Sequence, residues 1–165
     1  MSESDETSFE AFYRDELAVI AALGAVLTGS RDAGLDVAHE AMLRAFREWR
    51  SKVSRLDRPG AWVRRVAINL AIDTNRRDGR QRAGLERLAL EREPAVDSFV
   101  DDGFWVAVRE LPPRQRAVIA LHYVDDMPVR DIAATRDTTD GAVKSALSVA
   151  RRRLATVLAV EEVVP

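Results

Sequence analysis

The chain has 165 residues, of which 47% are hydrophobic and 32% charged, so it can bury modest cores behind a charged surface and is not disordered throughout. It contains no cysteine, which excludes disulfides, thiolate metal sites and thiol nucleophiles and makes the cytoplasm the expected location. The net charge of -2 excludes a uniformly basic coat for nucleic acid, although charge is strongly segregated along the chain.

The first 40 residues are acidic, with nine Asp or Glu residues against two arginines. We expect residues 1–8 to be a disordered acidic tail, and a helix to start at the possible capping box of Thr7 and Glu10 and to end near Gly29. The apolar stretch Leu17–Leu27 covers about half of a membrane span and follows an acidic segment. We therefore expect neither a signal peptide nor a membrane anchor.

Two more helices are predicted before residue 78, and no segment shows the sustained alternation that is typical of strands. The first runs from about Leu35 to Lys52 and the second from Ala61 to about Arg77, separated by the Pro59–Gly60 turn signal. The second lies in a basic segment, since residues 62–92 hold eight arginines against four acidic residues. In the predicted helix from Leu35 to Lys52, the apolar side chains recur at steps of three and four, and we expect them to point into a core. They are Val37, Ala41, Met42, Ala45, Phe46 and Trp49.

The basic helix after Pro59 and Gly60 has a polar stripe formed by Arg65, Asn69 and Arg76, and its apolar residues face away from this stripe. An asparagine among arginines can read a nucleic-acid base that lies within reach. The same spacing is equally typical of an exposed polar helix face without a ligand. Both interpretations remain open from the spacing alone.

The segment Asp78–Asp101 holds two glycines, a proline and scattered charges, and we interpret it as a linker between domains. A short helix is predicted from Phe104 to Leu111. Pro113 can open the next helix, which should run to about Tyr123 and end before the turn Asp125–Pro128.

From residue 129 onward the pattern predicts a helix-turn-helix, with helices over Val129–Thr135 and about Thr139–Val160. Thr139 is a reasonable N-cap for the second helix. Lys144, Ser148 and Arg151 share one face of it, which suits phosphates and base edges in a major groove, although a solvated basic helix has the same pattern. The opposite face is expected to pack on the domain core through Val143, Leu147, Ala150, Leu154 and Leu158.

These elements predict an all-α fold of two small helical domains joined by a flexible linker. Two blocks of this sequence resemble the extracytoplasmic-function group of the sigma-70 family. The first is Asp-Val-Ala-His-Glu-Ala-Met-Leu-Arg-Ala-Phe at 36–46 with Ala-Trp-Val-Arg-Arg-Val-Ala-Ile-Asn-Leu-Ala-Ile-Asp at 61–73. The second is Leu-Pro-Pro-Arg-Gln-Arg-Ala-Val-Ile-Ala-Leu-His-Tyr at 111–123, followed by Asp131-Ile-Ala and Gly141-Ala-Val-Lys-Ser.

The resemblance implies a helical sigma region 2 over residues 9–78, a linker over 79–101, a region 4 helix-turn-helix over 102–160 and a tail over 161–165. Region 2 would bind the clamp helices of the largest subunit of core RNA polymerase through Asp36, Glu40, Arg44 and Arg47. It would also melt and read the minus-10 promoter element through the loop 52–60 and through Arg64, Arg65, Asn69, Arg76 and Arg77. Region 4 would meet the polymerase flap and read the minus-35 element through Thr139, Lys144, Ser145, Ser148, Arg151 and Arg152.

Five positions depart from what members of this family often carry. Ala146 and Val149 stand where many have arginine, Arg136 and Asp137 stand where many have an apolar residue and glycine, and Asp140 adds an acid at the start of the recognition helix. These departures predict that region 4 binds DNA weakly or reads an unusual element, since each lost phosphate contact lowers affinity.

The alternatives are a stand-alone helix-turn-helix regulator, which would bind duplex DNA unaided, and a sigma-like protein that only binds partners. An enzyme is disfavoured because the side chains of the adjacent His39 and Glu40 diverge and no Gly-rich phosphate loop is present. We expect no metal and no cofactor. The expected partners are core polymerase, promoter DNA and an anti-sigma factor, with the protein in the cytoplasm and at the nucleoid when polymerase-bound.

Overall fold

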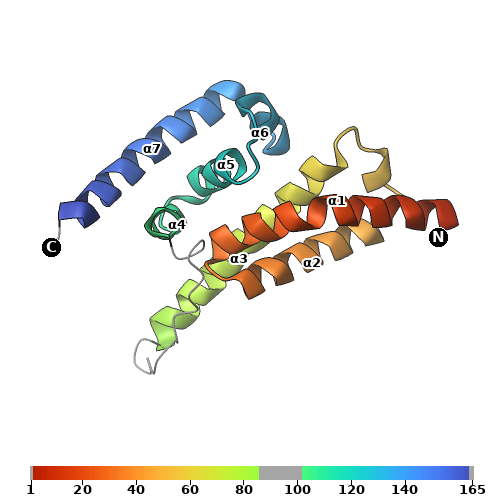
Figure 1. The fold of residues 1–165 in the computed structure, drawn as a ribbon, viewed down its shortest axis with the longest axis horizontal. Helices are drawn as coiled ribbons and strands as arrows, with labels where there is room; N and C mark the ends of the chain where they lie inside the picture. The colour runs from red at the N-terminus through yellow and green to blue at the C-terminus, as the bar shows by residue number, and fades with distance from the viewer. Residues whose placement is uncertain (1, 86–101, 164–165) are drawn as a thin grey trace.

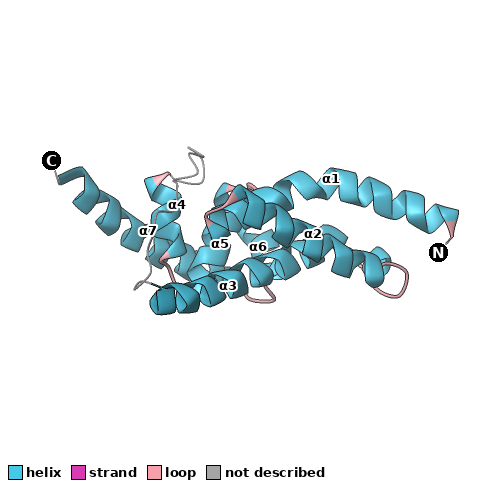
Figure 2. Ribbon diagram, turned by 90° about the horizontal axis from the view of Figure 1, so that it is seen from below, coloured by secondary structure: helices cyan, strands magenta, loops and turns pink. Residues whose placement is uncertain are grey.

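The computed structural model describes the backbone of residues 2–85 and 102–163 and the side chains of residues 2–74 and 102–159. In these ranges every regular element is helical, which confirms the predicted all-α class (Figure 2). The elements in chain order are α1 (Glu3–Thr28), α2 (Arg31–Arg47), the 3-10 helix η1 (Val53–Arg55), α3 (Pro59–Leu85), α4 (Gly103–Arg109), α5 (Pro113–Tyr123), α6 (Val129–Thr135) and α7 (Asp140–Val163).

Helices α1 to α3 form the first helical unit, in which α1 and α2 run antiparallel and α3 packs across both (Figure 1). Two glycines allow the backbones of α1 and α2 to approach closely. A Cβ atom added to Gly34 would lie 2.3 Å from the backbone nitrogen of Ala25, and one added to Gly24 would lie 2.8 Å from the carbonyl oxygen of Gly34. The core of this unit is shielded from solvent. Its fully buried side chains include Ile20, Leu23, Leu27, Met42, Val63 and Ile68.

The start of α1 corrects one prediction. Residues 3–8, which we expected to belong to a disordered tail, form the first turns of α1, and the N-cap is Ser2 rather than Thr7. Ser2 accepts a hydrogen bond from the backbone nitrogen of Asp5, and three acidic residues in the first turn interact favourably with the helix dipole. The acidic composition that suggested disorder is therefore the composition that stabilises this helix terminus.

The other element boundaries also shift. Ser30 caps α2, which begins at Arg31 rather than Leu35 and ends at Arg47. Helix α3 continues to Leu85, so residues 79–85 of the expected linker are helical, and residues 86–101 lie outside the described part. Similarly, residues 161–163 of the expected tail complete α7. Phe46, expected in the core, is 42% exposed, although its ring packs on that of Phe9 with the centroids 5.0 Å apart.

Helices α4 to α7 form the second unit, with α7 packed across α4, α5 and α6. The predicted apolar stripe of α7 is confirmed for Val143, Leu147, Ala150 and Leu154, which are buried, and Leu158 is half-buried. Thr139 is the N-cap as predicted, because its hydroxyl accepts a hydrogen bond from the backbone nitrogen of Ala142 at 3.1 Å. In the turn before it, Asp137 has φ of 52°, the left-handed region that favours the glycine expected there from the resemblance.

The two units pack against each other. Helices α4 and α5 contact α1, and α6 contacts α3, while α7 lies on the side away from α1 to α3 (Figure 1). The chain termini lie at opposite ends of the molecule in both views (Figures 1 and 2). None of the described helices is long and apolar enough to cross a membrane.

Candidate nucleic-acid interface

The exposed face of α7 is the most regular basic surface among the described residues. Lys144, Ser145, Ser148, Arg151 and Arg152 are all exposed, and they lie opposite the buried stripe that fixes α7 on its domain. The geometry of α6, the turn and α7 leaves this face open, as a recognition helix requires. The predicted residues are therefore brought together on one surface.

Arg151 is held in place from α5. Its Nε donates a hydrogen bond to the hydroxyl of Tyr123 at 3.0 Å, and its guanidinium lies over the Tyr123 ring, 5.8 Å from the centroid. Tyr123 is 45% exposed and its ring also contacts Phe104 edge-on. The sequence did not indicate this residue, because only the three-dimensional structure brings α5 beside α7.

Two of the positions in α7 that depart from the family pattern, Ala146 and Val149, lie away from the open basic face to different degrees. Ala146 is buried at 8% exposure, and Val149 lines an apolar groove between α4 and α7. An arginine at position 146 would start from the buried side of α7, whereas Val149 is half-buried and lines the groove together with the exposed Arg152. Their identity therefore bears more on the packing of α7 than on its open basic face.

The groove between α4 and α7 has a volume of about 590 Å³. Apolar side chains of both helices line the groove, together with the charged residues Glu110, Arg152 and Arg153. Val157 on its wall is 46% exposed. An apolar groove with charged residues at its edge suits an amphipathic helix.

The residues predicted for polymerase binding share the outer face of α2. Glu40 and Arg44 form an ion pair at 2.8 Å, four residues apart on the helix, whereas Asp36 and Arg47 are exposed. Three large apolar side chains lie exposed on the same helix, namely Leu35, Leu43 and Phe46, each 41–42% exposed. Sequence reasoning missed them as surface residues, because helical spacing alone does not say how far a neighbouring helix covers the face.

The predicted minus-10 residues on α3 do not form one free surface. Arg65 and Asn69 are exposed, but the Arg64 side chain is only 13% exposed. The side chains of Arg76 and Arg77 lie outside the described residues. In the preceding loop, the Lys52 ammonium lies over the Trp62 ring, 5.5 Å from its centroid, so the loop is packed onto the start of α3.

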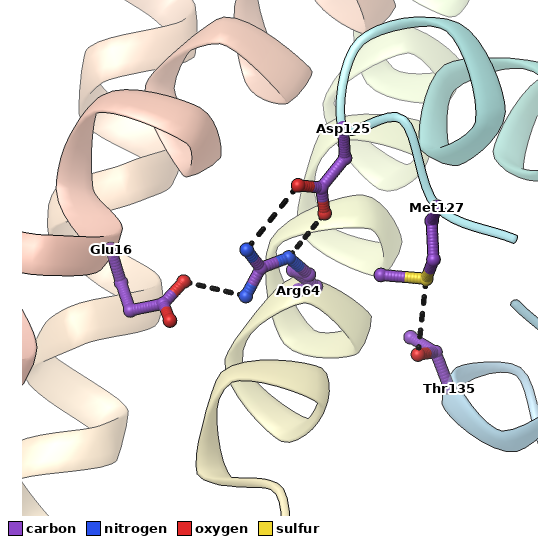
Figure 3. Close-up of polar contacts among 5 residues, drawn as sticks. All are labelled: Glu16, Arg64, Asp125, Met127 and Thr135. Atoms are coloured by element: carbon purple, nitrogen blue, oxygen red, sulfur yellow. Dashed lines mark hydrogen bonds and ion pairs between the residues drawn. The ribbon is translucent and has the colours of Figure 1, made fainter. Parts of the chain in front are cut away.

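Arg64 is enclosed by two carboxylates from different parts of the chain (Figure 3). Its Nη1 donates to Glu16 Oε2 on α1 at 2.5 Å, and its Nε and Nη2 donate to the two carboxylate oxygens of Asp125, in the turn after α5. Burial by itself lowers the pKa of the Arg64 guanidinium, but the hydrogen bond to Asp125 and the charge of Glu16 outweigh it and raise the pKa above its ordinary value. Arg64 therefore stays cationic in this arrangement.

Further polar contacts join the two units around Arg64. Arg58 donates to Asp131 at 2.8 Å, and Arg136 donates to the side-chain oxygen of Asn69 at 3.3 Å. Within the described residues no three His, Cys, Asp or Glu side chains come together as a metal site would require. The candidate site thus consists of cationic and polar surfaces on α3 and α7.

Each of the two helical units matches a different family model. The family model "Sigma-70 region 2" matches residues 11–81, which contain most of α1 and all of α2, and the model "Sigma-70, region 4" matches residues 103–154, from α4 into α7. The chain belongs to the sigma-70 family. The expected membership of its extracytoplasmic-function group is confirmed as well.

Two relatives illustrate the relationship of this sigma-70 family chain. It is 28% identical over 145 residues to the ECF RNA polymerase sigma factor SigE of Mycolicibacterium smegmatis, an alignment that covers 81% of this chain and 54% of SigE. The chain thus spans about half the length of that curated relative. Its fold is similar to the sigma factor RpoE of Bartonella quintana, solved in complex with the anti-sigma factor NepR, with a TM-score of 0.68 and 24% identity over 93% of this chain and 98% of that one.

Proposed function

We propose that this chain is a sigma factor, which binds core RNA polymerase and directs promoter-specific transcription initiation without catalysing a reaction itself. The observation that carries the proposal is the recognition helix α7, whose exposed face presents Lys144, Ser148 and Arg151 while its opposite face is locked into a region 4 domain. A matched region 2 precedes it on the same chain. A regulator that acts alone needs no such second unit.

In this proposal, α2 binds the clamp helices of the largest polymerase subunit. Asp36, Glu40, Arg44 and Arg47 supply charges, and the exposed apolar side chains between them supply area to bury. Interfaces of this kind take most of their binding energy from apolar anchors within a polar rim. The apolar groove between α4 and α7 is the corresponding binding site for an amphipathic helix of the polymerase flap.

Promoter recognition is divided between the two regions. The loop 52–60 and the α3 residues Arg64, Arg65 and Asn69, together with Arg76 and Arg77, bind and read the melted minus-10 strand, where base contacts and a cationic path for the backbone are both needed. Thr139, Lys144, Ser145, Ser148, Arg151 and Arg152 meet the major groove of the minus-35 element. Lysine and arginine there neutralise phosphates, and serine and threonine reach base edges or phosphates.

Regulation by a protein partner is part of the proposal. The Bartonella quintana relative with the same fold is in complex with an anti-sigma factor. We infer that a protein of that class restrains this chain, which would act in the cytoplasm and be found at the nucleoid when bound to polymerase.

The test is a pull-down of bacterial core RNA polymerase by the purified chain, followed by run-off transcription on a genomic promoter pool. We expect core binding and new transcripts. Lys144→Ala should reduce promoter binding by about tenfold and lower the slope of log affinity against log salt by about one, because one phosphate contact is lost. Asn69→Ala should reduce strand opening with little effect on duplex binding.

Arg14→Ala is the matched control. It also removes one cation, from an α1 side chain that is 72% exposed and paired only with a neighbouring glutamate within the described residues. It should leave both activities unchanged. If the chain binds no polymerase yet shifts a specific duplex alone, it is a stand-alone regulator and the proposal is wrong.

A further inference from the structure

Three arginines from different elements lie near one another where α6 contacts both α3 and α5. Arg136 directly follows α6 and is half-buried, with Arg65 of α3 and Arg114 of α5 as its cationic neighbours. The Nη1 of Arg136 donates to the side-chain oxygen of Asn69 at 3.3 Å, and Arg65 lies one turn before Asn69 on the same face of α3. We call Arg65, Arg114 and Arg136 the arginine cluster.

The carboxylates of the preceding turn and of α6 bind arginines outside this cluster. Asp125 accepts from Arg64, and Asp131 pairs with Arg58 at 2.8 Å. The charges that act on Arg136 come from the two other arginines of the cluster, and no carboxylate of the described residues is among them. The arginine cluster thus brings three positive charges together without an ion pair to any acidic side chain in the described ranges.

Such a cluster is unfavourable without a counter-charge, because like charges repel and burial removes the water that solvates them. Burial lowers the pKa of the Arg136 guanidinium, and the charges of Arg65 and Arg114 lower it further. Arginine nevertheless keeps its proton in proteins, so the repulsion is not relieved by deprotonation. A bound anion relieves it directly.

The side chains of the cluster select the class of anion. Arginine binds phosphate oxygens through two parallel hydrogen bonds, and a diphosphate offers enough charge and oxygens for more than one guanidinium. Arg65 and Arg114 are exposed, so a small anion can reach the cluster from solvent. The oxygen of Asn69 is bound by Arg136, and the other end of that amide is a further hydrogen-bond donor.

We propose that the arginine cluster is a binding site for a small anion that carries a diphosphate group, held by Arg65, Arg114 and Arg136. The site is additional to promoter and polymerase binding. It is also particular to this chain, since Arg136 stands where many members of the family have an apolar residue. The diphosphate is either free or the phosphate end of a nucleotide, and the experiment distinguishes these two sources.

The experiment titrates the full chain with inorganic pyrophosphate in a calorimeter, at constant ionic strength and without divalent cations. We expect saturable binding of one pyrophosphate per chain, about tenfold tighter than that of orthophosphate, because a second charged group gains hydrogen bonds. The melting temperature should rise with pyrophosphate concentration, as for any ligand that binds only the folded state. A titration with ADP identifies the source: tighter binding than pyrophosphate indicates a nucleotide, and equal or weaker binding indicates the free anion.

Arg136→Leu is the main variant and Arg130→Leu is its matched control. Each removes one cation from α6 or from the residue that follows it. The Arg130 side chain is 81% exposed and lies 3.7 Å from Asp131, outside the cluster. We expect Arg136→Leu to weaken pyrophosphate binding by about tenfold or more, since charge-assisted hydrogen bonds are lost. Arg130→Leu should bind within about twofold of the wild type, because exposed charges are screened.

Arg114→Leu is a second variant, which changes an exposed side chain in the first turn of α5 and should weaken pyrophosphate binding to a similar degree. Circular dichroism checks that each variant is folded. The proposal is wrong if the wild type binds pyrophosphate no more tightly than orthophosphate, or if Arg130→Leu weakens binding as much as Arg136→Leu does. It is also wrong if pyrophosphate does not bind and Arg136→Leu instead weakens binding of a single-stranded oligonucleotide, because the cluster then serves the nucleic-acid backbone.

Discussion

The close approach of α1 and α2 makes Gly34→Ala a sharp test of the region 2 structure. The new methyl group would lie 2.3 Å from the nitrogen and 2.6 Å from the Cα atom of Ala25, and 2.8 Å from the carbonyl oxygen of Ala21. Ordinary carbon contacts lie at about 3.5–4.0 Å. All three neighbours are backbone atoms, so the two helices must separate by roughly 1 Å, and no side chain can rotate to relieve the contact.

The magnitude follows from two opposing effects. Overpacking of a core costs about 1–3 kcal/mol, and backbone neighbours place Gly34→Ala at the upper end, about 3 kcal/mol. Alanine in place of glycine within a helix returns up to about 1 kcal/mol. The net loss of about 2 kcal/mol should lower the melting temperature of the chain by about 4–8 °C, the scale for a cooperative unit of about 150–250 residues.

Gly141→Ala is the matched control. The nearest atom to a Cβ there is the Thr139 hydroxyl oxygen at 4.0 Å, so the methyl group meets open space. The helix propensity of alanine then acts alone, and stability should stay equal or rise by up to about 1 kcal/mol. Circular dichroism during heating measures both variants. If Gly34→Ala melts within about 3 °C of the wild type, the packing described for α1 and α2 is wrong.

Two further predictions concern the surface. Tyr123→Phe removes the hydroxyl that accepts from Arg151 but keeps the ring below it, so duplex affinity should fall by only about twofold to threefold, the equivalent of about 0.5 kcal/mol. A loss as large as that of Arg151→Ala would mean that Tyr123 itself contacts DNA. At the other end of the chain, the Ser2 hydroxyl donates to the Asp5 carboxylate, and this bond, followed by a backbone hydrogen bond of Ser2 and then by the charge of Arg50, lowers the pKa of the Asp5 carboxyl below its ordinary value of 3.8. A carboxyl group whose pKa is lowered on folding stabilises the fold above pH 3.8, and this stabilisation is lost as the pH falls through the lowered value. The protection of the amides at the start of α1, measured relative to their intrinsic exchange rates, should therefore fall there and stay constant between about pH 5 and 8.

Local signals in the sequence were sufficient for the second region. Thr139 was identified as a cap because a threonine before a helix satisfies the helix's own first nitrogens, whatever lies around it. The buried stripe of α7 follows from spacing alone, since one side of a long helix must be covered. The same kind of signal misplaced the start of α1, where Thr7 and Ser2 are both acceptable caps and the helix begins after the earlier one.

Non-local contacts account for what the sequence did not reveal. Phe46 has the spacing of a core residue, but α1 covers only part of its ring. Arg64 and Asp125 are 61 positions apart, and no pattern near either one indicates the other. The predicted minus-10 residues were thus identified by residue type and position. Their carboxylate partners Asp125 and Asp131 became apparent only from the three-dimensional structure, in which the two regions lie side by side.

The end of α1 has a consequence for how the protein unfolds. Gly29 closes the helix in a left-handed conformation, with φ of 81°, and the last turn contains no basic residue of its own. The cation at this helix terminus comes from α4, where Arg109 donates to the carbonyl oxygen of Val26 at 3.1 Å. Loss of region 4 structure would leave that carbonyl without this donor, so each region contributes to the stability of the other. Heating the chain with its two regions in contact should therefore unfold both regions in one cooperative transition. If the regions are separated, the thermal unfolding should show two transitions.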